Sequence, residues 1–217
     1  SIESAWLKQG GNAVDLSEDN LIDCHDFDEA PCSGGSFYMS QALLSRHEGP
    51  LLESTDGYTP STQNCMSNVP FPPIPTSFVE DVRFLPAVKD SIKSAIIQFG
   101  AVASTMYFTM SNYNSSSYKY YDPVIDATDL NNPHGVTIIG WNDTLSFSGT
   151  STLGGWIIKD SYGTSWANNG YFYCSYDDAG ILAENAVFPI KYNVPSSPNN
   201  PHVYLHDELG WVDNYGY

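Results

Sequence analysis

Apolar residues recur with the period of an α-helix in the first half of the chain and in one later segment. Residues 1–9 place Ile2, Ala5 and Trp6 on one side, and Gly10-Gly11 follows as a helix-ending signal. Further helices are expected after an N-cap at Ser17, over residues 37–47, and over residues 89–99 before Gly100. The pattern therefore predicts a first part that is mainly helical.

The second half of the chain carries apolar and aromatic runs of strand length. Residues 155–173 read as an apolar strand, a polar turn that contains glycine, and an aromatic strand, which is a hairpin pattern. The expected strands are 101–109, the segment around 134–141, 156–158 and 171–173. Helices followed by strands are typical of an α+β protein with two segregated lobes, and here the sheet is expected to be mainly antiparallel.

Two polar side chains stand at the ends of neighbouring predicted strands. His134 begins one apolar strand, and Asp160 follows the first strand of the hairpin, where a hairpin alone needs no polar cluster. An imidazole beside a carboxylate is the arrangement of a general base and the group that orients it. The alternative is that both are ordinary polar groups at strand ends, and their spacing alone does not decide between the two.

The charge of the chain is strongly acidic. Its 217 residues include 8 Lys and Arg against 25 Asp and Glu, for a formal net charge of −17. A nucleic-acid partner is therefore not expected, because a phosphate backbone requires a basic face. No apolar run is long enough to span a membrane, and no signal peptide opens the chain. The histidines show no metal-ligand spacing, so neither a metal nor another cofactor is expected.

The four cysteines indicate the compartment. Cys65 lies in an irregular stretch over residues 49–75. Such a long irregular stretch is uncommon in a compact domain unless a cross-link holds it, and a disulfide is the candidate. This use of cysteine favours an oxidising compartment, and hence an extracellular or cell-surface location. Asn114-Ser115-Ser116 and Asn142-Asp143-Thr144 are glycosylation sequons, with acceptors Asn114 and Asn142, although such triplets also occur by chance.

Four segments, in order, resemble motifs of the papain-like cysteine peptidases. Residues 16–24 (LSEDNLIDC) are similar to the LSEQxLxDC segment of that family, and residues 32–35 (CSGG) are similar to its CxGG segment. Residues 133–136 (PHGV) resemble the strand of the catalytic histidine, and residues 159–166 (KDSYGTSW) resemble KNSWGxxW. Each motif alone is weak, but four in this order at these spacings are specific. The resemblance covers residues 1–190.

The resemblance implies a papain-like two-lobe fold with a cleft between the lobes. The helical lobe would span about residues 1–75, the sheet lobe about 76–190, and residues 191–217 would form a C-terminal linker. It also implies that His134 and Asp160 are catalytic, the imidazole as general acid–base and the carboxylate as the group that holds it in orientation.

The same resemblance assigns substrate binding and a disulfide. Gly34 and Gly35 would lie against the substrate, because glycine lets the backbone of an extended peptide approach closely. Tyr162 would cover the contact between the histidine and the acid. Cys24 would pair with Cys65, which would close the irregular stretch.

Three departures from the family pattern bear on activity. The nucleophilic cysteine is not among the four cysteines. Counted back along the first helix, it would fall roughly eight residues before Ser1, and about 130–150 residues ahead of His134, as in this class. Asp160 stands where the family has Asn, and Tyr162 stands where it has Trp. A preceding segment that carries the nucleophile is therefore an expected partner.

The resemblance implies hydrolysis of peptide bonds in peptide or protein substrates by a Cys-His-Asp/Asn mechanism. The tail, residues 204–217, is similar to the junction in microbial multidomain members, where a lectin-like domain follows. Two alternatives remain. One is a catalytically inactive papain-like module with a structural or binding role. The other is an acyl-transferring, transglutaminase-like enzyme, although residues 17–24 and 32–35 fit the peptidase pattern better.

Overall fold

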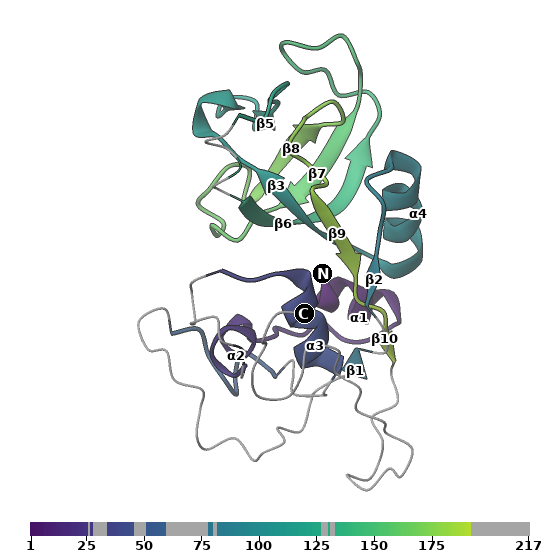
Figure 1. The fold of residues 1–217 in the computed structure, drawn as a ribbon, viewed down its shortest axis with the longest axis vertical. Coiled ribbons are helices and arrows are strands. Elements are labelled where there is room, and N and C mark those ends of the chain that lie inside the picture. Colours follow the sequence, from purple (N-terminus) through teal and green to yellow (C-terminus); the bar gives the residue numbers. More distant parts are fainter. Residues whose placement is uncertain are drawn as a thin grey trace, which may run out of the picture. The chain divides into compact units, whose positions relative to one another are not determined.

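The computed structural model describes residues 1–25, 27, 34–45, 51–59, 78–79, 82–126, 130 and 133–191 (Figure 1). The helices are α1 (Ile2–Lys8), α2 (Glu18–Asp23), α3 (Phe37–Ser45), α4 (Lys89–Phe99) and the 3-10 helix η1 (Met110–Asn112). The strands are β1 (Phe78–Val79), β2 (Arg83–Phe84), β3 (Val102–Tyr107), β4 (Tyr113–Asn114), β5 (Lys119–Tyr120), β6 (Pro133–Asn142), β7 (Gly155–Lys159), β8 (Tyr171–Ser175), β9 (Glu184–Val187) and β10 (Ile190–Lys191).

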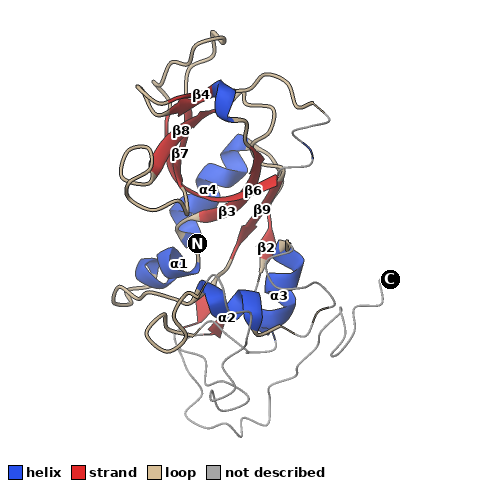
Figure 2. Ribbon diagram, turned by 90° about the vertical axis from the view of Figure 1, so that its left-hand side faces the viewer, coloured by secondary structure: helices blue, strands red, loops and turns tan. Residues whose placement is uncertain are grey.

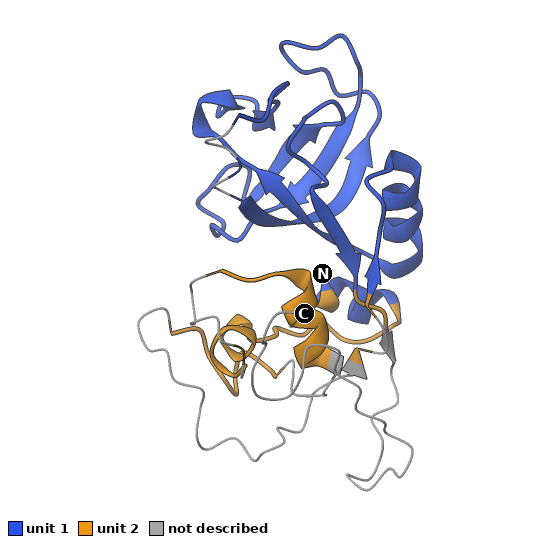
Figure 3. Ribbon diagram, viewed as in Figure 1, with its two compact units in different colours: residues 1, 3–8, 83–187 blue, residues 2, 9–82, 188–217 orange. Residues whose placement is uncertain are grey.

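The chain divides into two compact units (Figure 3). Unit 1 holds Ser1, Glu3–Lys8 and Arg83–Val187, and unit 2 holds Ile2, Gln9–Val82 and Phe188–Tyr217. Helices and a sheet rich in antiparallel pairs confirm the predicted α+β class.

Unit 1 is built on a sheet of eight described strands in the order β2-β9-β3-β6-β7-β8-β5-β4. Its pairings are antiparallel except that of β5 with β8, so the mainly antiparallel sheet is confirmed. Strand β9 is missing from the sequence prediction, because Glu184 and Asn185 have low strand propensity.

The core of unit 1 forms where α4 packs against β3 and β6 (Figure 2). Ile92 of α4 is buried in one cluster with Val102 of β3, Ile138 of β6 and Trp156 of β7. Burial alternates along the first half of β6, as in a strand with one face on the core. A bulge between Ile138 and Gly140 then shifts the register of β6 against β7.

Helix α1 is fastened to the start of β3. The Ser1 Oγ donates to the Ala101 carbonyl at 3.1 Å, and the Ala101 N–H donates to the Ser4 Oγ at 3.0 Å. Gly100 ends α4, as predicted, with φ +99°, and a Cβ there would lie 2.8 Å from the Ser4 Oγ. These contacts group α1 with the sheet, whereas the sequence assigns it to the helical lobe. The lobe boundaries stay a proposal.

Unit 2 contains α2, α3 and the two-stranded sheet of β1 and β10. The predicted N-cap is confirmed, because the Ser17 Oγ accepts from the Asn20 N–H at 2.9 Å. Asp19 of α2 accepts from both the N–H and the Oγ1 of Thr59, at 2.6 Å each. This carboxylate therefore ties the described loop of residues 51–59 to α2.

The cysteines differ in their surroundings. Cys174 on β8 is a free thiol and is fully buried, as expected for a structural cysteine. Cys24, at the end of α2, is disulfide-bonded. Cys65 lies outside the described residues, as do Cys32 and residues 192–217, which make up nearly all of the predicted linker. The pairing of Cys24 with Cys65 stays a prediction.

Two findings concern the described ranges alone. None of their helices is both long and apolar enough to cross a membrane. In the same ranges, no three His, Cys, Asp or Glu side chains gather in a way that could hold a metal ion.

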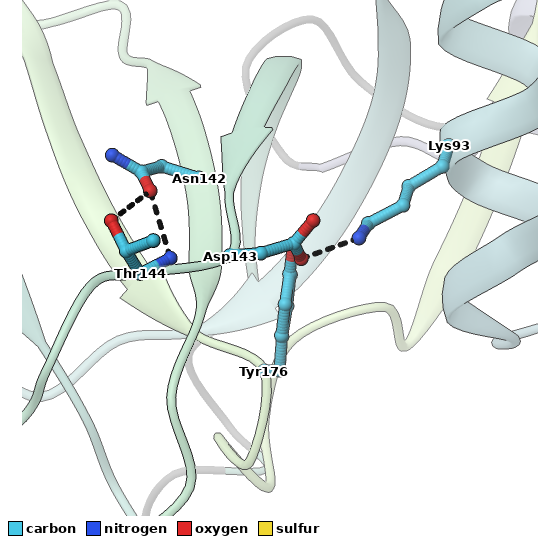
Figure 4. Close-up of polar contacts among 5 residues, drawn as sticks. All are labelled: Lys93, Asn142, Asp143, Thr144 and Tyr176. Atoms are coloured by element: carbon cyan, nitrogen blue, oxygen red, sulfur yellow. Dashed lines mark hydrogen bonds and ion pairs between the residues drawn. The ribbon is translucent and has the colours of Figure 1, made fainter.

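A charged contact joins α4 to the loop after β6 (Figure 4). The Lys93 Nζ donates to the Asp143 Oδ1 at 2.6 Å, and the Tyr176 hydroxyl donates to the same oxygen at 2.8 Å. These two donors, Lys93 first, lower the pKa of the Asp143 carboxyl. The Lys93 ammonium also lies 5.3 Å from the Trp141 ring centroid, so the helix is held by cation–π contact as well as by charge.

The buried carboxylate of Asp178 fastens two loops of unit 1. Its Oδ2 accepts from the Asp122 N–H at 2.8 Å, and its Oδ1 accepts from the N–H groups of Gly180 at 3.0 Å and Ile181 at 2.8 Å. Burial raises the pKa of Asp178 from 3.8 to about 6, although these donors act in the opposite direction. The folded protein therefore binds a proton at Asp178 more readily than the unfolded chain does.

We expect Asp178 to reduce stability as the pH rises from about 4 to about 7. In this window the folded state binds more protons than the unfolded chain, and the contribution is lost as the pH passes the folded pKa of about 6. The difference between the two pKa values corresponds to roughly 3 kcal/mol. Urea unfolding at about pH 4.5 and about pH 7.5 measures this contribution. Between these two pH values, the unfolding free energy of Asp178→Asn should fall by less than that of the wild type. An identical fall in both proteins would contradict the assignment.

Candidate active site

His134 and Asp160 lie at the same edge of the sheet because β6 and β7 are antiparallel neighbours. Thr137 of β6 faces Lys159 of β7, so the start of β6 lies beside the residue that follows β7. The His134 Nε2 lies 3.1 Å from the Asp160 Oδ1, which is hydrogen-bond distance. The predicted contact between the two side chains is confirmed.

The carboxylate of Asp160 is held by its own backbone surroundings. Its N–H donates to the Gly170 carbonyl at 2.9 Å, and its Oδ1 accepts from the Ser161 N–H at 2.7 Å as well as facing His134. The side chain of Asp160 is 1% exposed, whereas that of His134 is 19% exposed. The acid is therefore fixed and nearly dry, and the imidazole is reachable from solvent.

Aromatic rings pack around the pair. Tyr162 stacks on the His134 ring with centroids 5.2 Å apart, and Trp166 meets Tyr162 edge-on at 5.7 Å. Phe108, which follows β3, lies 6.4 Å from the His134 ring. Tyr162 itself is 56% exposed, so it covers the imidazole on one face while its own outer face meets water.

The sequence prediction missed two members of this ring cluster. Phe108 lies within the predicted strand 101–109, and Tyr113 follows that strand. Both are far in sequence from the motif segments 133–136 and 159–166. Tyr113 stacks on Trp166 at 5.4 Å, and Phe108 lies 5.9 Å from Tyr113. No local pattern distinguishes them, because their role comes from packing between strands that are distant along the chain.

Cys174 does not supply a nucleophile to this pair. It is the only cysteine in the sequence of unit 1, and it is fully buried. Burial, followed by the charge of Asp178, raises the pKa of the Cys174 thiol well above its usual value. A reactive cysteine needs the opposite, an accessible thiol with a lowered pKa.

Gly34 and Gly35 belong to unit 2. Both are exposed, and Gly34 has φ +134°, a conformation that favours glycine. A Cβ added at either position would meet no atom of the described residues within 4 Å. The backbone here is therefore open to a close approach, which is compatible with the predicted role in substrate binding. That role, and the cleft between the lobes, stay proposals.

Comparison with known proteins identifies the class. The profile of the family described as papain family cysteine protease matches residues 1–190. The chain belongs to the papain family of cysteine proteases. This confirms the predicted family.

Relatives of known sequence include proteins named as cysteine proteinases from diverse organisms. The chain is 28% identical over 208 residues to cysteine endopeptidase Rep1 of Oryza sativa subsp. japonica, covering 92% of this chain and 52% of that protein. It is 29% identical over 211 residues to cysteine proteinase A of Leishmania mexicana, covering 94% of this chain and 53% of that protein. The chain thus spans about half the length of the curated relatives it matches.

Solved structures show the same fold. The cysteine protease and lectin-like domains of Cwp84, a surface layer associated protein of Clostridium difficile, match with a TM-score of 0.76 at 26% identity. The match covers 88% of this chain and 45% of that one. Procathepsin L 3 of Tenebrio molitor matches in fold, with a TM-score of 0.66 at 24% identity over 86% of this chain and 59% of that one. The two-lobe papain-like α+β class is confirmed.

We expect Tyr162 to control access of reagents to His134. Tyr162→Ala removes the ring that stacks on the imidazole, so carbethoxylation of His134 should become faster by about 3–10-fold. Mass spectrometry follows the modification. Tyr162→Phe keeps the ring and should keep the wild-type rate. Tyr171→Ala, which removes another exposed ring, serves as control. Equal rates in Tyr162→Ala and wild type would show that the ring does not shield the imidazole.

Proposed function

We propose that this domain hydrolyses peptide bonds as a cysteine peptidase, with His134 as general acid–base and Asp160 as its orienting group. The observation that supports it is the 3.1 Å contact between the His134 Nε2 and the Asp160 Oδ1, held on neighbouring strands. An imidazole whose one nitrogen meets a fixed acceptor keeps its other nitrogen free for proton transfer.

The nucleophile is proposed to be a cysteine of a segment that precedes Ser1. His134 would take its thiol proton, and the thiolate would attack the substrate carbonyl carbon to form a C–S bond. His134 would then give that proton to the leaving amine as the C–N bond breaks. A water molecule would then attack the thioester carbon, with His134 accepting its proton. A C–O bond would form, the C–S bond would break, and His134 would return the proton to the thiolate.

Asp160 does the work of the family's Asn with a different group. Its Oδ1 accepts from the His134 Nε2 in the same way as an amide oxygen would. The carboxylate also adds a negative charge next to the imidazolium that forms during the reaction, as in Ser-His-Asp enzymes. The Tyr162 ring, in place of the family's Trp, would keep water from this contact.

The substrates are proposed to be extended peptides or proteins. Gly34 and Gly35 would hydrogen-bond the peptide backbone, for which their open surroundings are suitable. The net charge of −17 would draw cationic substrates slightly faster, an effect that salt should weaken.

The domain is further proposed to work outside the cell or at its surface. Cys24 is disulfide-bonded, which fits an oxidising compartment, and Cys65 is its proposed partner. The proposed glycan acceptors Asn114 and Asn142 are both exposed, and the Asn142 Oδ1 accepts from the N–H and the Oγ1 of Thr144 (Figure 4). A lectin-like domain, as in Cwp84, would follow the linker.

Alkylation and removal of the imidazole test the activity. Peptide hydrolysis by the full-length protein should be abolished by a thiol-alkylating agent, because the thiolate is the attacking group. His134→Ala should lower kcat/KM by about 10²–10⁴-fold or more, since it removes the general acid–base. Activity that survives alkylation would exclude the thiol mechanism. A wild-type protein that hydrolyses no peptide at all would favour the inactive module instead.

Asp160→Asn should keep kcat/KM within about tenfold of wild type, because the amide oxygen can still accept from His134. Asp160→Ala removes the acceptor and should cost about 10²-fold, with the substrate held at the same concentrations. Steady-state hydrolysis compares the two variants, and circular dichroism confirms that each is folded. An Asn variant as weak as the Ala variant would show that the charge, and not the acceptor, is what the site requires.

A further inference from the structure

The second oxygen of Asp160 has no partner among the described residues. Its Oδ1 accepts from the Ser161 N–H and faces His134, but its Oδ2 is buried and makes no hydrogen bond. Leaving a buried polar atom unpaired costs about 1–3 kcal/mol, and more for a charged group. An amide at this position would present an N–H there, whereas a carboxylate presents a second acceptor. The position thus calls for a hydrogen-bond donor that the family's Asn would not need.

Tyr113 offers such a donor. Its hydroxyl is also a buried polar atom without a hydrogen bond among the described residues. Burial, then Tyr118, then Asp160 raise the pKa of the Tyr113 phenol. The phenol therefore stays protonated and can donate. The Tyr113 hydroxyl and the Asp160 Oδ2 are thus an unpaired donor and an unpaired acceptor among the described residues, and both are buried in unit 1.

The ring of Tyr113 is fixed in place. It stacks on Trp166 at 5.4 Å with an interplanar angle of 15°, and it meets Phe172 edge-on at 6.4 Å. Trp166 in turn contacts Tyr162, which stacks on His134. The hydroxyl of Tyr113 is therefore carried by the same packed ring cluster that surrounds the His134–Asp160 pair, so its position is coupled to theirs.

We propose that Tyr113 is a positioning residue for the His134–Asp160 pair: its hydroxyl donates to the Oδ2 of Asp160, with no more than one water molecule between them. This fixes the plane of the carboxylate, so that Oδ1 stays aimed at His134. The inference rests on the proposed function for its catalytic consequence, whereas the contact itself is a property of the fold.

The other ionisable groups around the pair do not supply this donor. Lys159 precedes Asp160 but is exposed at the sheet edge, and His134 is already engaged with Oδ1. Tyr113 is thus the group to change.

The activity test uses Tyr113→Phe in the full-length protein. This variant deletes the hydroxyl and keeps the ring packing, so kcat should fall by about 3–10-fold with little change in KM. Tyr171→Phe deletes a hydroxyl from an exposed tyrosine of β8 and should change neither kcat nor KM. An unchanged kcat in Tyr113→Phe would overturn the proposal.

A double-variant comparison separates a positioning role from a general structural one. In the Asp160→Asn background the second acceptor is gone, so adding Tyr113→Phe should have an effect of less than about twofold on kcat. The same loss in both backgrounds would mean that Tyr113 acts independently of Asp160, and the proposal would be wrong.

Urea unfolding of the same four proteins does not depend on activity. The losses in unfolding midpoint for Tyr113→Phe and Asp160→Asn should be non-additive, because the two changes remove one shared interaction. Additive losses would overturn the contact. A wild-type protein without alkylation-sensitive hydrolysis, together with non-additive midpoints, would reject the proposed function and keep the contact between Tyr113 and Asp160.

Discussion

The antiparallel pairing of β6 with β7 is the constraint on which the candidate site depends. Thr137 faces Lys159 across this pair, so the first residues of β6 share an edge with the residue after β7. A slip of one residue would turn His134 or Asp160 to the opposite face of the sheet and separate them. The bulge in β6 lies beyond Ile138, on the far side of Thr137, and so leaves the site end of the strand regular.

The buried side chains of the sheet hold this register. Trp156 and Ile158 of β7 and Phe172 of β8 are almost entirely buried, and each would be exposed by a slip. Phe172 also meets Trp166 edge-on, at 5.3 Å, so the hydrophobic core continues into the rings around His134. Core packing and the placement of the His134–Asp160 pair are therefore parts of one network. Among the described residues the buried Asp160 Oδ2 makes no hydrogen bond, and the proposed donation from Tyr113 would join it to this network.

Sequence predicted the features that depend on local signals. The cap at Ser17, the end of α4 at Gly100 and the buried thiol of Cys174 follow from residue type and immediate neighbours, and all three are present. The contact between His134 and Asp160 was predictable because each residue lies in a recognisable motif. Tyr113 was not, because its place comes from stacking against Trp166, more than fifty residues away in sequence. The attachment of α1 to β3 was missed for the same reason.

The buried thiol of Cys174 can report local opening of the sheet around β8. It lies on β8, which pairs with β7 on one side and β5 on the other, and none of its surface reaches solvent. A thiol reagent can reach it only when these strands part, so its labelling rate measures the free energy of that local opening. An accessible catalytic thiolate would instead react from the closed state. The time course of labelling would therefore separate reaction of a catalytic thiolate from reaction of Cys174 during local opening of the sheet. Both would be measured in one sample without an introduced probe.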